Sequence, residues 1–328
     1  MMKILATLFS RFTLMLIAVV IIATLLPAQG AAKVATDAFT NIAIALLFFL
    51  HGAKLSRQAI IQGAGHWRLH SLVFFSTFVF FPLLGLALRP IVEPLMTKEL
   101  YLGFMYLCVL PATVQSAIAF TSIARGNIPA AICSASGSSI AGIFITPLLI
   151  ALVLSDYSDS VPPITLMSVL KIILMLLVPF AAGHFSRPWT LGFISKYPKL
   201  VGIVDQGSIL LVVYAAFSEA VVEGLWQTTS YQALIAVVVV SCVILALALA
   251  FTAISSKLLG FELADRITIV FCGSKKSLAN GLPMAKVIFA GHPIGAIVLP
   301  LMIFHQIQLM ICAWIAEYLK QRQTPPTQ

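Results

Sequence analysis

Two adjacent lysines, Lys275 and Lys276, lie near the middle of residues 266–289, an otherwise apolar stretch long enough to enter a bilayer. A lysine at that depth costs roughly 2.5–3.5 kcal/mol on insertion scales, so it marks a functional site by default. The same stretch also contains small, polar and helix-breaking residues, which are Gly273, Ser274, Ser277, Asn280, Gly281 and Pro283. We therefore expect a broken membrane helix whose lysines supply fixed positive charge, the chemistry that binds an anion.

A second apolar segment, residues 100–124, is interrupted in a similar way. Pro111 is followed by the polar side chains Thr113, Gln115, Ser116, Thr121 and Ser122. Pro111 and Pro283 lack an N–H and are expected to leave the carbonyls of Leu107 and Ala279 without helix partners. In lipid such carbonyls must be buried in protein or face a wet cavity, where free carbonyls bind cations and half-helix N-termini bind anions. The alternative for each segment alone is an ordinary proline kink, but a matched pair favours a transport site.

Other polar residues in apolar segments have two interpretations each. Ser134 and Ser136 belong to a run of small residues that suits close helix packing, and their hydroxyls could also line the site. His305 and Gln308 share one helix face, where they could relay protons or bond to a neighbouring helix. Glu219 is the clear acidic candidate within the membrane, although it could also snorkel to the interface, and Asp205 lies at the inner end of the same segment.

The composition describes the scaffold that must position these residues. Of 328 residues, 60% are hydrophobic and 9% charged, against about 25% charged in a soluble domain, so the chain is a polytopic membrane protein. The net charge of +9 comes from lysines and arginines between apolar segments, which indicates a lipid bilayer and no nucleic acid. The five cysteines show no metal or redox spacing, and we predict no cofactor. No HExxH, GxSxG, P-loop or paired membrane carboxylates occur, which argues against an enzyme and an ATP-driven pump.

Ten apolar segments are predicted, at about 12–26, 39–53, 71–88, 100–124, 128–154, 164–182, 201–222, 231–254, 267–290 and 294–318. The first could pass for a secretory signal, but its removal would spoil the helix count. With the N-terminus inside, thirteen positive residues (Lys3 among them) lie in cytoplasmic connections or termini and three outside, so both termini are predicted to be cytoplasmic. Five segments on each side of residues 158/159 predict two inverted repeats, 1–158 and 159–328, in which the fourth and ninth segments correspond.

The motifs of the chain then permit a comparison. Residues 110–127, 133–142, 208–220 and 271–285, together with 51–61 and 299–310, resemble the bile acid:sodium symporter superfamily. The similarity is greatest to its YfeH-type bacterial members, which group with the seventh member of human solute carrier family ten. The resemblance implies an all-α membrane protein of ten helices in two inverted five-helix repeats. Helices one, two, six and seven would form a panel domain and the other six a core domain, where helices four and nine cross at unwound middles.

The resemblance also locates the family's sodium ligands, and several are replaced here. The glutamate of the bile-acid-transporting branch corresponds to Phe271, and the glutamine and asparagine that follow correspond to Lys275 and Lys276. The asparagine of the fourth helix falls at Ala117, beside Ser116. Later hydroxyl ligands fall near Ala131 and Ala135, with Ser134 and Ser136 close by. Na⁺ prefers oxygen ligands, so these departures argue against ordinary two-sodium coupling.

Three functions follow as hypotheses. The first is a secondary-active transporter of an organic anion or amphipathic solute in the bacterial inner membrane, with Lys275 or Lys276 replacing a sodium ion. Because burial disfavours the charged form of a lysine, a neutral lysine that cycles with protons and His305 is a version of it. The second is a sodium-coupled symporter with altered ligands from Gln115, Ser116, Ser134, Ser136 and carbonyls. The third is a non-transporting membrane regulator linked to calcium homeostasis. The sequence leaves the substrate, the oligomeric state and the choice of coupling ion, Na⁺ or H⁺, open.

Overall fold

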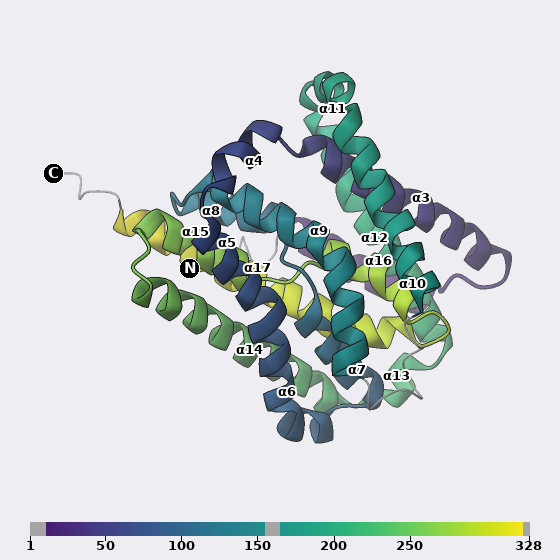
Figure 1. Cartoon of the computed structure of the whole chain (residues 1–328). Coiled ribbons are helices and arrows are strands. Elements are labelled where there is room, and N and C mark those ends of the chain that lie inside the picture. The colour runs from purple at the N-terminus through teal and green to yellow at the C-terminus, as the bar shows by residue number, and fades with distance from the viewer. Residues whose placement is uncertain (1–10, 155–164, 324–328) are drawn as a thin grey trace.

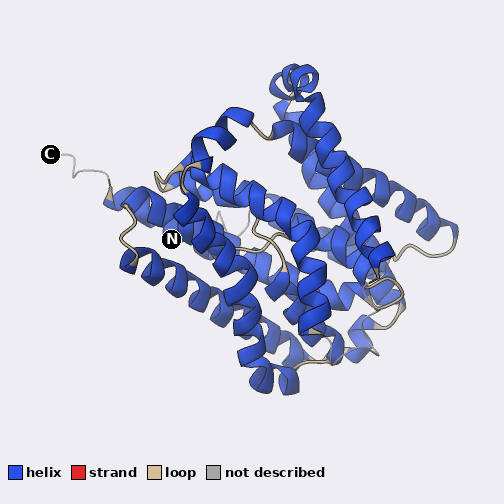
Figure 2. Cartoon of the chain, viewed as in Figure 1, coloured by secondary structure: helices blue, strands red, loops and turns tan. Residues whose placement is uncertain are grey.

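A computed structural model describes residues 11–154 and 165–323, and within these ranges the chain forms helices and no strand (Figure 2). The predicted all-α class is confirmed. Lys3 and the predicted repeat boundary at 158/159 lie outside the described residues. The helical elements run in the order α2 Arg11–Leu25, α3 Ala31–Lys54, α4 Arg57–Ala64, α5 Trp67–Phe75, η1 Ser76–Phe80, α6 Phe81–Val92, η2 Glu93–Leu95, α7 Lys98–Val109, α8 Gln115–Ile123, α9 Ile128–Val153, α10 Leu166–Ile172, η4 Ile173–Leu177, α11 Val178–Lys196, α12 Pro198–Val222, α13 Leu225–Thr228, α14 Tyr231–Leu258, α15 Leu263–Gly273, α16 Leu278–Ile288 and α17 Ile294–Arg322.

Seven of these helices or joined helices are long and apolar enough to cross a membrane. They are Ala31–Lys54, Trp67–Leu95, Ile128–Val153, Leu166–Lys196, Pro198–Val222, Tyr231–Leu258 and Ile294–Arg322. The three remaining predicted segments correspond to the short helix α2 and to two broken pairs, α7 with α8 and α15 with α16. The sixth segment continues to Lys196, well past the predicted end at 182, because Arg187 and Pro188 are accommodated within the helix.

Both interrupted segments are broken in the structure, but one of the breaks lies earlier than its proline suggested. Residues 110–114 separate α7 from α8, and Pro111 lies inside that break as predicted. In the ninth segment the break covers residues 274–277, and Pro283 lies within α16. The side chain of Ser277 accepts a hydrogen bond from the N–H of Asn280 and so starts α16 before the proline is reached.

A π-helical turn, Ser76–Phe80, joins α5 to α6 and changes the hydrogen bonding of the third predicted segment. The N–H of Phe81 donates to the carbonyl of Ser76, five residues earlier. The next residue, Pro82, has no N–H with which to continue that pattern, so the carbonyl of Thr77 is left free of its helix partner. A cation can bind this carbonyl.

The helices α3, α11 and α12 pack closely together (Figure 1). Helix α2 packs on α12. The approach of α3 to α11 depends on Gly52 and Gly183. A Cβ atom at either glycine would lie 1.9 Å from a carbonyl oxygen of the other helix, that of Phe180 or Phe49. Helix α7, in which Leu100–Val109 are all buried, packs on α17 and α6. The division into panel and core domains stays a prediction.

Candidate functional site

The two breaks meet, although they are far apart in the sequence. The N–H of Ser277 donates to the carbonyl of Pro111 at 3.0 Å, which joins one break to the other. The hydroxyl of Tyr106, on α7, donates to the carbonyl of Gly281, on α16, at 2.6 Å. Helix α9 supports both breaks through three side chains. Ser138 Oγ accepts from the N–H of Ala112, Thr146 Oγ1 donates to the carbonyl of Val109, and Ser139 Oγ accepts from Asn280 Nδ2.

Lys276 ties the breaks together with its ammonium group. Its Nζ donates to the carbonyl oxygens of Thr77 at 2.8 Å, Cys108 at 2.9 Å and Leu110 at 2.7 Å, and lies 4.2 Å from the ring centre of Phe81. The side chain is fully buried. All three carbonyls come from places where regular hydrogen bonding is interrupted, at the π turn and at the end of α7. The same interruptions that would be costly in lipid therefore form a binding site for one cation.

The main chain of Lys276 is held as firmly as its side chain. Gln308, on α17, accepts from the N–H of Lys276 and donates to its carbonyl, both at 2.9 Å. The same amide nitrogen lies 2.9 Å from His305 Nδ1. His305 and Gln308, which the sequence placed on one helix face, therefore form a pair that fixes the break, and His305 also lines a cavity.

Lys275 has different surroundings. It is also fully buried, yet its Nζ has no hydrogen-bond partner in the described protein. Its Nζ lies over two aromatic rings, 4.3 Å from the ring centre of Phe120 and 5.3 Å from that of Phe271. Phe271 stands where the resemblance places the family's sodium-binding glutamate. At the position where the resemblance expects a carboxylate, the protein has a ring that contacts a built-in cation.

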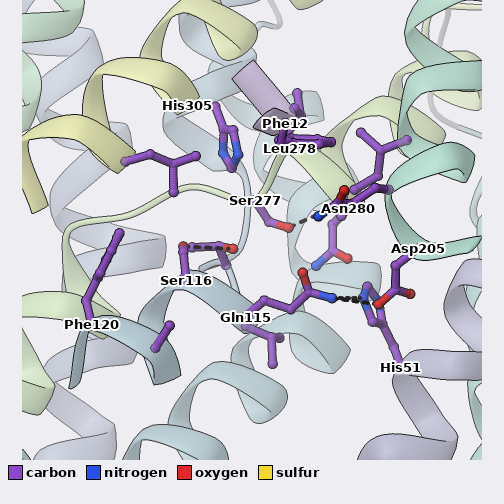
Figure 3. Close-up of a pocket in the computed structure, with 17 residues that line it drawn as sticks. Phe12, His51, Gln115, Ser116, Phe120, Asp205, Ser277, Leu278, Asn280 and His305 are labelled. Carbon is purple, nitrogen blue, oxygen red and sulfur yellow. Dashed lines mark hydrogen bonds between the residues drawn. The ribbon is translucent and has the colours of Figure 1, made fainter. Parts of the chain in front are cut away.

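A cavity of about 290 Å³ lies at the N-termini of α8 and α16, where Figure 3 shows Gln115, Ser116, Ser277, Asn280 and His305 around it. A second cavity, of about 510 Å³, lies between α3, α8, α9 and α11. It shares four lining residues with the first, which are His51, Val114, Gln115 and Ala119. Neither Lys275 nor Lys276 is among the lining residues of either cavity. Both side chains are fully buried instead.

The predicted site residues thus fall into two layers. Thr113, Gln115, Ser116, Ser277, Asn280 and His305 line the first cavity. Ser274, Lys275, Lys276 and Gln308 are buried behind it. The three serines suggested for sodium are not brought together. Ser116 lines the first cavity, Ser136 the second, and Ser134 is bonded to His70 Nδ1 at 2.6 Å. Within the described residues no group of three His, Cys, Asp or Glu side chains could hold a metal ion.

The sequence pointed to Glu219 as the intramembrane acid, but the buried carboxylate beside the cavity is Asp205. Glu219 forms an exposed ion pair with Lys33 at 2.7 Å. Asp205 pairs with Lys54 and accepts a hydrogen bond from Gln115 Nε2 at 3.0 Å. It lies in the first cavity next to His51 (Figure 3). The signal available in the sequence was the position of Lys54 and Asp205 at the same predicted side of the membrane.

Comparison with known proteins agrees with this geometry. The model of the SBF-like CPA transporter family matches residues 10–321. The chain is 58% identical to the uncharacterized protein PA2026 of Pseudomonas aeruginosa over 313 residues, which cover 95% of this chain and 93% of that protein. It is 55% identical to the putative symporter YfeH of Escherichia coli over 321 residues (97% and 94%), and 31% identical to sodium/bile acid cotransporter 7 of Xenopus tropicalis over 280 residues (83% and 79%). The protein therefore belongs to the SBF-like CPA transporter family, and its broken, cavity-lining helices are those of a multi-pass membrane transporter.

Proposed function

We propose that the protein is a secondary-active transporter of an organic anion or amphipathic solute, in which Lys276 occupies the place of a coupling sodium ion. The observation that carries the proposal is the contact of Lys276 Nζ with three backbone carbonyls where the two breaks meet. Carbonyl oxygens freed at broken membrane helices are what small cations bind in transporters. Here the cation is the ammonium group of Lys276, which is part of the protein and cannot dissociate.

The anion is expected to bind in the first cavity, between the N-termini of α8 and α16. Each half-helix presents the positive end of its dipole and N–H groups without helix partners to that space. Val114, the N-cap of α8, has no polar side chain to cap the first N–H groups of the helix. Ser277 caps only one N–H of α16, that of Asn280. A carboxylate or sulfonate between Ser116 and Asn280 would accept from these groups.

The second cavity suits the remainder of an amphipathic solute. Its lining is largely apolar, with Val114, Ile118, Ile132 and Phe180 among its residues, and it meets the first at Gln115. A ligand whose charged group lies between the half-helices can therefore place an apolar body against α9 and α11. Binding of this kind combines apolar burial with a few positioned polar groups.

The orientation follows from the positive-inside prediction. His51, Lys54 and Asp205 lie at the ends of α3 and α12 that are predicted to be cytoplasmic. The cavities beside them would then open toward the cytoplasm of a bacterial inner-membrane protein whose termini both lie inside. The ten-helix arrangement with inverted repeats belongs to the same proposal.

Uptake into proteoliposomes tests the proposal. A panel of taurocholate, a sulfated steroid and short dicarboxylates would be offered with and without an inward Na⁺ gradient, with choline as the replacement. We expect uptake of at least one anion that does not need Na⁺ and is lost in Lys276→Met. Lys171→Met, which changes an exposed lysine of α10, is the control and should transport normally.

Two results would contradict the proposal in different ways. Uptake that requires Na⁺ and survives Lys275→Met combined with Lys276→Met would favour a sodium symporter with altered ligands. Absence of uptake and exchange for the whole panel, with folded protein, would favour a membrane regulator that transports nothing.

A further inference from the structure

Asp205 is a buried carboxylate at the wall of the first cavity, and only part of it is satisfied. Its side chain is 7% exposed. Oδ2 accepts from Lys54 Nζ and from Gln115 Nε2, whereas Oδ1 has no hydrogen-bond partner. A buried carboxylate oxygen without a donor is unfavourable, so it is a place where a proton or cation is readily taken up.

Asp205 also links three helices. It lies on α12, Lys54 on α3, and Gln115 at the first turn of the half-helix α8. Lys54 lines the second cavity and Asp205 the first, so the ion pair stands at the boundary between them. An anion that occupies these cavities is therefore within reach of the cation that now neutralises Asp205.

We propose that Asp205 is a proton-binding residue that couples anion binding to proton uptake. An anion competes with Asp205 for the ammonium of Lys54, which stays charged and pairs with the anion. The carboxylate that loses Lys54 takes one proton from the aqueous cavity on Oδ1, while Oδ2 keeps the N–H of Gln115. When the anion leaves, the proton returns to water and Lys54 pairs with Asp205 again.

The charge balance fixes the stoichiometry of this step. Lys54 and Asp205 are together neutral, and one bound anion would leave an uncompensated negative charge in a buried site. Such a charge is strongly unfavourable unless it is paired or neutralised by a proton. One proton for each anionic group restores neutrality.

A proton fits this site better than a sodium ion. The groups that contact the carboxylate are nitrogen donors, Lys54 Nζ and Gln115 Nε2, and Na⁺ needs several oxygen ligands. The titratable neighbours are His51 and Lys54 on α3 and His305 on α17, whereas α8 and α16 contribute only neutral side chains to the cavity.

The coupling role rests on the proposed anion transport, but the proton site can be tested without any substrate. Thermal unfolding of the purified protein in detergent would be followed at about pH 8 and about pH 5. Lys54→Met orphans the carboxylate, so we expect its midpoint to fall by several degrees at the higher pH and to recover at the lower pH. Adding Asp205→Asn to Lys54→Met should restore the midpoint at the higher pH and remove the acid effect.

A matched control exists on the same two helices. Lys33 and Glu219 form an exposed ion pair between α3 and α12, so Lys33→Met should change the midpoint little and show no recovery in acid. Absence of acid recovery in Lys54→Met, or equal recovery in Lys33→Met, would overturn the proton site. Recovery with NaCl but not with choline chloride at the higher pH would replace the proton by a sodium ion.

The coupling itself is tested in proteoliposomes with taurocholate as the probe. A more acidic outside should accelerate uptake in the wild-type protein, and this acceleration should be lost in Asp205→Asn. If the uptake rate of the wild-type protein does not depend on the pH gradient, the proposed coupling is wrong, but the proposed anion transport is not contradicted. Absence of uptake for every anion of the panel would contradict the transport proposal, whereas the unfolding experiment would still decide the proton site.

Discussion

Replacing Lys276 should be far more damaging than replacing Lys275, although the two residues are adjacent and both are buried. Lys276→Met removes the donor of three buried carbonyls, those of Thr77, Cys108 and Leu110. Each unsatisfied buried acceptor costs about 1–3 kcal/mol. The methionine needs no charge desolvation, which offsets part of this loss. Removing one partner from a buried charged interaction costs about 3–5 kcal/mol, and we expect Lys276→Met to fall in that range.

Lys275→Met changes a different balance. The variant loses contacts with the rings of Phe120 and Phe271, each worth about 0.5–2 kcal/mol. It also removes a buried ammonium that has no hydrogen-bond acceptor, and this relief is of similar or larger size. The free energy of unfolding should therefore stay near the wild-type value or rise.

Thermal unfolding in detergent, monitored by the fluorescence of the four tryptophans, measures both variants under one condition. The sharper form of the test uses Lys276→Ala, which leaves three carbonyls around a space once filled by an ammonium. Methylammonium or Na⁺ should raise the midpoint of this variant and not that of Lys171→Ala, because a ligand that binds only the folded state stabilises it. Equal losses in the Lys275 and Lys276 variants, without rescue by any cation, would refute the view that Lys276 stands in an ion's place.

Three further substitutions have predicted effects on stability. Gln308→Leu removes both hydrogen bonds to the main chain of Lys276 and should lower the unfolding free energy by about 1–3 kcal/mol, measured by thermal unfolding. Gly142→Ala places a Cβ 2.6 Å from the Cβ of Pro111, so the break must shift, and stability should fall by about 1–3 kcal/mol with a parallel loss of uptake. Burial, and after it the nearby charge of Glu219, raises the pKa of Glu223. The stabilisation that results is present at low pH and is lost as the pH rises through the raised pKa. Glu223→Gln should therefore flatten this part of the curve of unfolding midpoint against pH.

The sequence was informative where a chemical signal is local. Prolines, serines and the two lysines inside apolar segments predicted both broken helices, and the structure contains both breaks. The second break, residues 274–277, lies within the predicted interruption from Gly273 to Pro283 but is shorter, because Pro283 lies inside α16. In the structure, Ser277 caps the start of α16, and Gln308 accepts a hydrogen bond from the N–H of Lys276 within the break. These two contacts set the position of the break. The second of these is a contact between distant parts of the chain.

Which residues of different helices contact one another could not be predicted from the sequence, because these contacts also join distant parts of the chain. The sequence did not identify Thr77 as a partner of Lys276, because the carbonyl of Thr77 is freed by a π turn in another segment. Asp205 looked like a residue at a helix end, and Lys54 like a topology signal. Only the packing of α12 against α3 turns them into a buried ion pair beside a cavity.

The charges around the cavity favour an anion even before any ligand is considered. Lys54 and Asp205 cancel one another, whereas neither Lys275 nor Lys276 forms an ion pair with a carboxylate of the described residues. Carbonyls and aromatic rings solvate a cation without cancelling its charge, so both lysines contribute positive potential to their surroundings. Lys276 donates its hydrogen bonds to carbonyls where the two breaks meet. Lys275 lies behind Phe120, a residue that lines the cavity. The positive charge of Lys275 therefore acts across one ring, in a low-dielectric site where such attraction is poorly screened, and an anion between α8 and α16 is the ligand it would stabilise.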